Sequence, residues 1–191
     1  PDAHAGYGLP IGGVLATQNA VIPYGIGVDI GCRMAMTIFD ANEKAFNQYH
    51  YHCKIALKEW THFGMEGGLE TKQDHEILDN SLFNEIAFIK QLGSSGSGNH
   101  FVEWGLLDME LQNKLKLKAG NYVALLSHSG SRGLGANIAM HYFKEAMKVC
   151  KLPNYAKHLA WLDLDTALGQ EYWLAMTLAG NYAKACHEVI H

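Results

Sequence analysis

Three short glycine-rich blocks carry side chains that bind metal ions. They read Val-Asp-Ile-Gly-Cys over 28–32, Gly-Ser-Gly-Asn-His-Phe over 96–101 and His-Ser-Gly-Ser-Arg-Gly over 128–133. A carboxylate, a thiol and two imidazoles delivered by separate segments form a ligand set that can hold a catalytic metal. The sequence therefore predicts one metal site built from Asp29, Cys32, His100 and His128.

Each block also has an ordinary explanation when it is taken alone. In a glycine-rich turn, Asp29 can bond its own backbone and Cys32 can be a packing residue. The block around His100 can be a plain Gly/Ser loop, although flexible amides beside an imidazole also suit a phosphate next to a metal. All three blocks fall at expected strand-to-loop junctions, where one sheet can present them together. Metal plus phosphate is therefore the joint interpretation.

The third block adds an expected anion site. It follows a buried apolar run and precedes a helical pattern, so its backbone N–H groups and the helix N-terminus can bind a phosphate. Arg132 can add a bidentate contact. Asp2 and His4 are possible further contributors to the metal site. By ligand softness alone, a Cys, Asp and two His set favours zinc.

Composition describes a folded protein with no basic excess. The chain has 191 residues, 48% of them hydrophobic, and a formal net charge of −4, so any nucleic-acid contact is a local patch. The four widely spaced cysteines predict reduced thiols and a cytoplasmic protein. No apolar run reaches the roughly 20 residues of a membrane helix. Because the chain begins inside a motif without methionine, we expect one partial domain over 1–191, truncated at both ends.

The spacing of apolar residues predicts strands first and helices later. Short strands are expected at 12–16, 20–22, 34–39, 101–104 and 121–127, and helices at 42–63, 74–91, 135–150 and 166–190. The run 111–118 is ambiguous. There is no regular βαβ rhythm, so the expected fold class is α+β, with mixed sheets and flanking helices.

Four longer motifs resemble the RtcB family of tRNA-splicing and RNA-repair ligases. They are PDAHAGYGLPIGG at 1–13, GVDIGC at 27–32, LGSSGSGNHFVE at 92–103 and HSGSRGLG at 128–135. The motifs cover most of the chain in the family's order. The resemblance implies an enzyme that joins RNA 2′,3′-cyclic phosphate or 3′-phosphate ends to 5′-hydroxyl ends, using GTP and two Mn²⁺ ions.

The resemblance also implies a role for individual residues. Asp29, Cys32 and His100 correspond to ligands of one manganese, and Cys32 and His128 to ligands of the second, with the thiolate bridging both. Manganese then replaces zinc, because hard phosphate oxygens complete each coordination shell. Arg132 is similar to a residue that holds an RNA phosphate. The GTP-binding strip corresponds to Asn99, His100, Phe101, Val102 and Glu103.

The implied mechanism passes through a guanylylated histidine and an RNA end activated by GMP. By the same resemblance, that histidine and a further metal ligand lie beyond residue 191, so no catalytic nucleophile is expected in this chain and the chain alone is expected to be inactive. A small activator protein of the archease type is a possible partner. Two alternatives stay open: a metal-dependent phosphoesterase, and a non-catalytic nucleotide- or RNA-binding paralogue.

Overall fold

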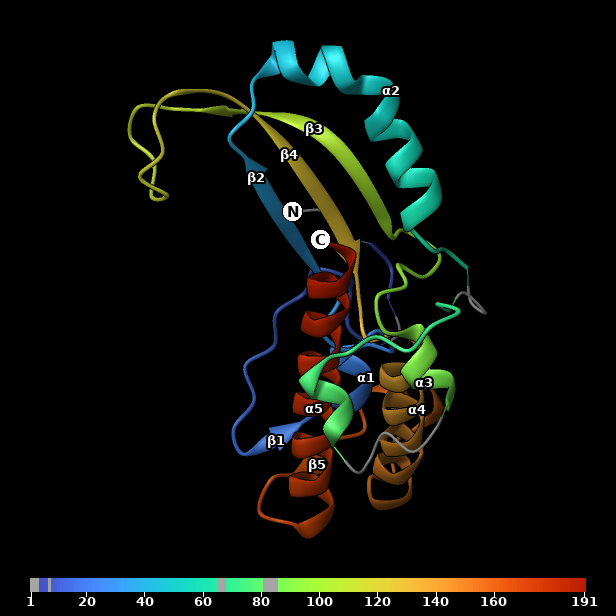
Figure 1. Cartoon of the computed structure of the whole chain (residues 1–191). Coiled ribbons are helices and arrows are strands. Elements are labelled where there is room, and N and C mark those ends of the chain that lie inside the picture. Colours follow the sequence, from blue (N-terminus) through green and yellow to red (C-terminus); the bar gives the residue numbers. More distant parts are fainter. Residues whose placement is uncertain (1–3, 7, 65–67, 81–85) are drawn as a thin grey trace. The chain divides into compact units, whose positions relative to one another are not determined.

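The computed structural model describes residues 4–6, 8–64, 68–80 and 86–191 (Figure 1). The chain forms two compact units, each built from two stretches of sequence. The first unit contains Pro1–Cys32 and Gly130–Ala183, and the second contains Arg33–Ser129 and Lys184–His191. Helices and two small antiparallel sheets make up these units, which confirms the α+β class.

The first unit is mainly helical. Its regular elements are β1 (Ala20–Val21), α1 (Pro23–Ile26), α4 (Arg132–Val149), a 3-10 helix (Asn154–Leu159), β5 (Leu162–Asp163) and the first part of α5 (Ala167–Ile190). β1 and β5 pair antiparallel. The hydrophobic core combines small and large side chains from α4 and α5, as the helical spacing predicts. Ala139 and Ala146 from α4 meet Tyr172 and Ala179 from α5, and all four are buried.

A three-stranded antiparallel sheet forms the centre of the second unit. Its strands are β2 (Arg33–Phe39), β3 (Phe101–Met109) and β4 (Gly120–Ser129), in the order β2-β4-β3. β4 pairs along both edges, and its buried run Val123–Leu125 explains why apolar residues follow one another without alternation. Helix α2 (Glu43–Trp60) packs on β3 and β4 (Figure 1).

Local signals account for the boundaries of α2. Asn42 caps its first turn, because the side-chain Oδ1 accepts a hydrogen bond from the Ala45 N–H at 3.1 Å. The helix ends at Trp60, near the expected boundary of 42–63. No helix in the described part of the chain is both long and apolar enough to cross a bilayer.

Several expected elements differ from the structure. No strand forms at 12–16, and the helix expected over 74–91 is replaced by a 3-10 helix (Glu76–Asp79) and the short α3 (Ile86–Gln91), with 81–85 outside the described residues. The run 111–118 contains no helix or strand. β3 and β4 are longer than predicted, and α4 begins at Arg132 rather than at Gly135.

Candidate metal centre

Three strand ends meet at one end of the three-stranded sheet. Because β4 runs antiparallel to both neighbours, its last residues lie beside the first residues of β2 and β3. His128 pairs with Met34 on one side and with Phe101 on the other. Cys32 is bonded directly to the first residue of β2, and His100 to the first residue of β3. The antiparallel register thus delivers a thiol and two imidazoles to the same end of the sheet.

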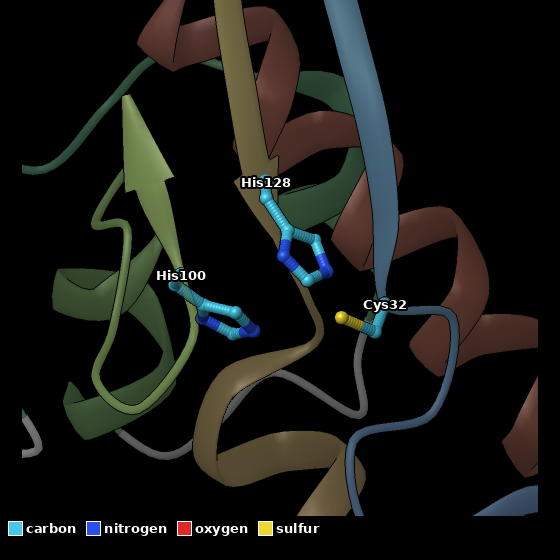
Figure 2. A group of neighbouring side chains, drawn as sticks. All are labelled: Cys32, His100 and His128. Atoms are coloured by element: carbon cyan, nitrogen blue, oxygen red, sulfur yellow. The ribbon is translucent and has the colours of Figure 1, made fainter. Parts of the chain in front are cut away.

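The ligand atoms of Cys32, His100 and His128 lie close together. Within the described residues, the Cys32 sulfur and one nitrogen from each ring all lie within 4.8 Å of one another. Figure 2 shows the sulfur and both rings turned toward a common point. Zinc, for comparison, binds sulfur at about 2.3 Å and imidazole nitrogen at about 2.0–2.1 Å. After small side-chain movements, one ion of this size reaches all three atoms, so this cluster can hold a metal ion.

Backbone carbonyls fix the tautomer of both histidines. His100 Nδ1 lies 2.7 Å from the carbonyl oxygen of Ser95, and His128 Nδ1 lies 3.2 Å from that of Asn99. A carbonyl oxygen accepts hydrogen bonds and cannot donate them, so each Nδ1 carries the proton. Each Nε2 is then left with the lone pair that binds a metal, which is the usual outer-shell arrangement of histidine ligands.

Asp29 is held in place beside Cys32 by the third glycine-rich block. Its Oδ1 accepts a hydrogen bond from the Ser131 N–H at 3.0 Å, and its main-chain carbonyl accepts one from the Cys32 N–H at 3.2 Å. Gly130 allows this close approach, because a Cβ at that position would overlap the Asp29 carboxylate. Asp29 is therefore a neighbour of the Cys32 thiol, while the three-residue cluster does not include it.

The surroundings of Cys32 keep its thiol protonated unless a cation binds next to the sulfur. Although the side chain is exposed overall, partial burial, the negative charge of Asp29 and a hydrogen bond to Asp29 raise the pKa of the thiol to about 12. A divalent ion next to the sulfur reverses this balance, because a coordinated thiol loses its proton. A soft donor, two imidazoles with oriented lone pairs and a nearby carboxylate are therefore a donor set that fits a transition metal.

The second block is less open than its composition predicts. The Ser94 and Ser95 N–H groups donate to the carbonyls of Gln91 and His62, and Leu92–Gly96 is buried. These two amides lie just before the block, and within it the Gly96 carbonyl accepts a hydrogen bond from the Gly64 N–H. The solvent-exposed part of the loop is Ser97–Asn99, directly before His100. Contacts with residues 62–64 set this arrangement, and no local sequence pattern could have indicated them.

The expected GTP-binding strip, Asn99 to Glu103, begins two residues before β3 and continues into its first three residues. Asn99 and Glu103 are exposed, Phe101 and Val102 are half-buried, and the Phe101 ring contacts the His128 ring with centroids 5.8 Å apart. Arg132 is half-buried at the first position of α4, with a left-handed φ of 58°. The adjacent Ser131 N–H already binds Asp29, so part of the expected anion site is used by the protein itself.

Two further groups at the candidate site carry no side-chain signal. The carbonyls of Ser95 and Asn99 orient the histidine ligands, and backbone atoms of this kind cannot be identified from residue types. Of the possible extra ligands, Asp2 lies outside the described residues. His4 is exposed and pairs with Ile11 through its backbone.

Comparison with known proteins identifies relatives over the whole chain. The family model described as tRNA-splicing ligase RtcB matches residues 1–88 and 56–191. A tRNA-splicing ligase RtcB of Nanoarchaeum equitans is 30% identical over 234 aligned positions, covering 100% of this chain and 49% of the relative. The corresponding protein of Thermococcus kodakarensis is 28% identical, with the same coverages. An RNA-splicing ligase RtcB homolog 1 of Entamoeba dispar is 27% identical, covering 97% of this chain and 43% of the relative.

These alignments also show how the chain differs from its relatives. It spans about half the length of the curated relatives it matches. The alignment with the Nanoarchaeum equitans protein runs over 234 positions whereas the chain has 191 residues, so the relative carries residues inside the matched region that this chain lacks. The two family matches overlap over residues 56–88, a range that includes the 3-10 helix Glu76–Asp79. Because the family model matches this chain from residue 1 to residue 191, the chain belongs to the tRNA-splicing ligase RtcB family.

Proposed function

We propose that this chain forms the metal- and nucleotide-binding part of an RNA ligase that works in tRNA splicing or RNA repair. The observation that carries the proposal is the cluster of Cys32, His100 and His128 in a chain matched by this family throughout. The substrates are RNA with a 2′,3′-cyclic phosphate or 3′-phosphate end and RNA with a 5′-hydroxyl end. The protein is cytoplasmic and accepts an archease-type activator.

The proposed cofactor is Mn²⁺, as two ions, and the Cys32 thiolate would help to hold both of them. Asp29, Cys32 and His100 hold one ion, and Cys32 and His128 hold the other. When bound, such ions neutralise phosphate charge and polarise phosphoryl oxygens. The contribution of the chain is to place these donors at one end of the sheet and to fix both histidine tautomers through Ser95 and Asn99.

GTP is the proposed source of the activating group. Guanylyl transfer to a protein histidine releases pyrophosphate, and the GMP then passes to the RNA 3′-phosphate. Attack by the 5′-hydroxyl forms the new phosphodiester bond and releases GMP. Asn99 to Glu103 bind the nucleotide, and this assignment is supported by their position directly beside the imidazoles of the cluster. Arg132 binds an RNA phosphate.

One assay separates ligation from the two alternatives. The complete protein is incubated with GTP, MnCl₂ and two RNAs, one ending in a 3′-phosphate and the other beginning with a 5′-hydroxyl. Joined RNA that depends on both GTP and Mn²⁺ is expected. Release of inorganic phosphate without joining would indicate a phosphoesterase, and RNA or GTP binding without either product would indicate a non-catalytic paralogue.

Metal binding is expected to strengthen as pH rises. The free thiol of Cys32 has a pKa raised to about 12, whereas the metal-bound form is a thiolate, so binding releases one proton throughout the working range. Affinity should then increase about tenfold for each pH unit between 7 and 9. Isothermal titration calorimetry with Co²⁺, in buffers of different ionisation enthalpy, measures both the affinity and the number of protons released. A pH-independent affinity would show that the thiol is not a ligand.

Arg132→Gln is expected to weaken RNA binding without changing metal binding. The loss of one charge-assisted contact corresponds to about tenfold in affinity for an RNA ending in a 3′-phosphate. Fluorescence anisotropy with RNAs that carry or lack the terminal phosphate measures this effect. The difference between the two RNAs should shrink in the variant. An equal loss for both RNAs would show that Arg132 does not bind the terminal phosphate.

A further inference from the structure

A network of hydrogen-bonded polar side chains lies on the face of β4 opposite to His128. Successive side chains of a strand point to opposite faces, so Ser127 and Ser129 point away from the face that carries His128. Both serines have 0% exposed surface. His187, in the last turn of α5, is 4% exposed and packs beside them. These residues all belong to the second unit.

Four hydrogen-bond contacts connect the residues of this network. Ser127 Oγ lies 2.6 Å from His187 Nδ1 and 2.8 Å from His191 Nε2. His191 Nδ1 lies 2.7 Å from Thr37 Oγ1 on β2. His187 Nε2 lies 3.3 Å from the carbonyl oxygen of Ser129. The end of α5 is therefore bonded to two adjacent strands of the sheet.

The contacts define where each proton lies. The Ser129 carbonyl only accepts, so His187 Nε2 carries a proton. Burial lowers the pKa of His187, which keeps the ring neutral and leaves Nδ1 to accept from the Ser127 hydroxyl. The Ser127 oxygen then accepts from His191 Nε2–H, and His191 Nδ1 accepts from Thr37. The Ser127 and Thr37 hydroxyls and the ring nitrogens of His187 and His191 are therefore each matched by a partner of the right kind.

The His187 ring is bonded to the two strand ends that carry metal ligands. Ser129, whose carbonyl accepts from His187, directly follows His128. The backbone of Arg33 also forms a hydrogen bond with the ring, and Arg33 directly follows Cys32. Arg33 and Ser129 are register partners in the sheet. One imidazole thus fixes the backbone positions next to two of the three clustered ligands.

A catalytic role for Ser127 does not fit this geometry. A serine between two imidazoles has the composition of an activated nucleophile. However, its side chain is fully buried in the central strand, so no substrate can reach the oxygen. The other ring nitrogen of His187 contacts the Ser129 carbonyl beside the cluster, and this contact favours a role in orienting ligands.

We propose that His187 is a positioning residue for the metal centre: by donating its Nε2–H to the Ser129 carbonyl, it sets the separation of Cys32 and His128. This inference rests on the proposed metal centre. It assigns a function to a histidine that is neither a ligand nor a nucleophile. Removal of an outer-shell partner of this type usually lowers metal affinity by about 10–100-fold.

Two substitutions distinguish the contributions of the two ring nitrogens of His187. In His187→Gln, the side-chain amide reaches the position of Nε2 and keeps a donor for the Ser129 carbonyl. In His187→Asn, the shorter amide reaches the position of Nδ1 and keeps a partner for Ser127, but it cannot reach the carbonyl. Glu188→Gln is the matched control, since Glu188 is the next residue of α5 and pairs with His75 and Lys184 outside this network.

Co²⁺ binding to the full chain tests the proposal. The wild type, His187→Gln and Glu188→Gln should share one affinity, one thiolate-to-cobalt absorption band and one set of d–d bands. His187→Asn should bind Co²⁺ about 10–100-fold more weakly, with shifted d–d bands. A wild-type spectrum and affinity in His187→Asn would overturn the proposal, and so would equal losses in both His187 variants.

A second variant keeps the test decisive if His187→Asn does not fold by circular dichroism. His187→Leu keeps a side chain of similar volume but has no donor for the Ser129 carbonyl, so it should weaken Co²⁺ binding and shift the d–d bands as His187→Asn does. Of the two His187 contacts, Ser127→Ala removes only the partner of Nδ1, and it should match the wild type, as His187→Gln does. A wild-type spectrum and affinity in His187→Leu would then refute the positioning role. Absence of a thiolate-to-cobalt band in the wild type is a separate result: it would reject the proposed metal centre itself, and the role of His187 with it.

Discussion

Replacement of Cys32 by alanine is expected to lower the affinity for Co²⁺ or Mn²⁺ by more than about 100-fold. Loss of an outer-shell partner costs about 10–100-fold, and the loss of a direct ligand should exceed that range. Cys32 also supplies the only thiolate of the cluster in the described residues, and the proposed bridge between two ions depends on it. Ligation by the complete protein should fall below detection.

The measurement is metal content after dialysis, together with the thiolate-to-cobalt band in a Co²⁺ titration. Cys53→Ala is the matched control, because Cys53 is a half-buried cysteine on α2 that is not one of the clustered ligands. It should keep wild-type metal content and the full charge-transfer band. Unchanged metal content in Cys32→Ala would remove Cys32 from the site and leave a two-histidine centre.

Sequence reasoning could locate the candidate ligands because glycine-rich junctions and strand ends are local features. Cys32, His100 and His128 each stand within two residues of a strand boundary, and the antiparallel register then brings them together. That register depends on pairing between residues far apart in the chain. The sequence could predict strands at these places. That the three ligand atoms lie within 4.8 Å of one another could be seen only in the folded sheet.

The failed helix at 74–91 shows how tertiary contacts override a local pattern. His75 Nδ1 accepts a hydrogen bond from the Ile77 N–H, and its Nε2 lies 3.0 Å from Glu188 Oε2 on α5. These bonds favour a single 3-10 turn, and Asn80 leaves it in an extended conformation. The apolar spacing at Leu78 was correct for burial, since Leu78 is 8% exposed, but it did not determine the type of helix.

The roles of serine and histidine in the second unit were also beyond local patterns. Neither His187 nor His191 lies in a glycine-rich block, so local patterns give neither residue a role at the candidate site. The structure places both rings within hydrogen-bonding distance of Ser127, with His187 buried and His191 exposed at the end of the chain. His191 directly follows α5 and comes four residues after His187, and its N–H donates to the His187 carbonyl at 3.0 Å, so the two side chains lie on the same side of the helix end. The signal that could have identified them is a polar pair on the face of a helix whose other buried residues are apolar.

Gly130→Ala is expected to displace the Asp29 carboxylate. The Cys32 thiol should then become more reactive, whereas the affinity of the site for metal should fall. The new Cβ would overlap the carboxylate, which must give up the hydrogen bond from the Ser131 N–H. Overpacking of this kind costs about 1–3 kcal/mol of stability. With Asp29 further away, two of the three causes that raise the pKa of the Cys32 thiol weaken, so the thiol should react faster with iodoacetamide at pH 8.

Metal affinity should move in the other direction, because the proposed carboxylate ligand has left its position. Faster alkylation of Cys32 combined with weaker Co²⁺ binding therefore distinguishes a displaced Asp29 from general loosening of the fold. Gly105→Ala is the control, since a Cβ there meets no atom within 4 Å. It should match the wild type in both measurements. If Gly130→Ala also matched the wild type in alkylation rate and affinity, Asp29 would neither tune the thiol nor bind the metal.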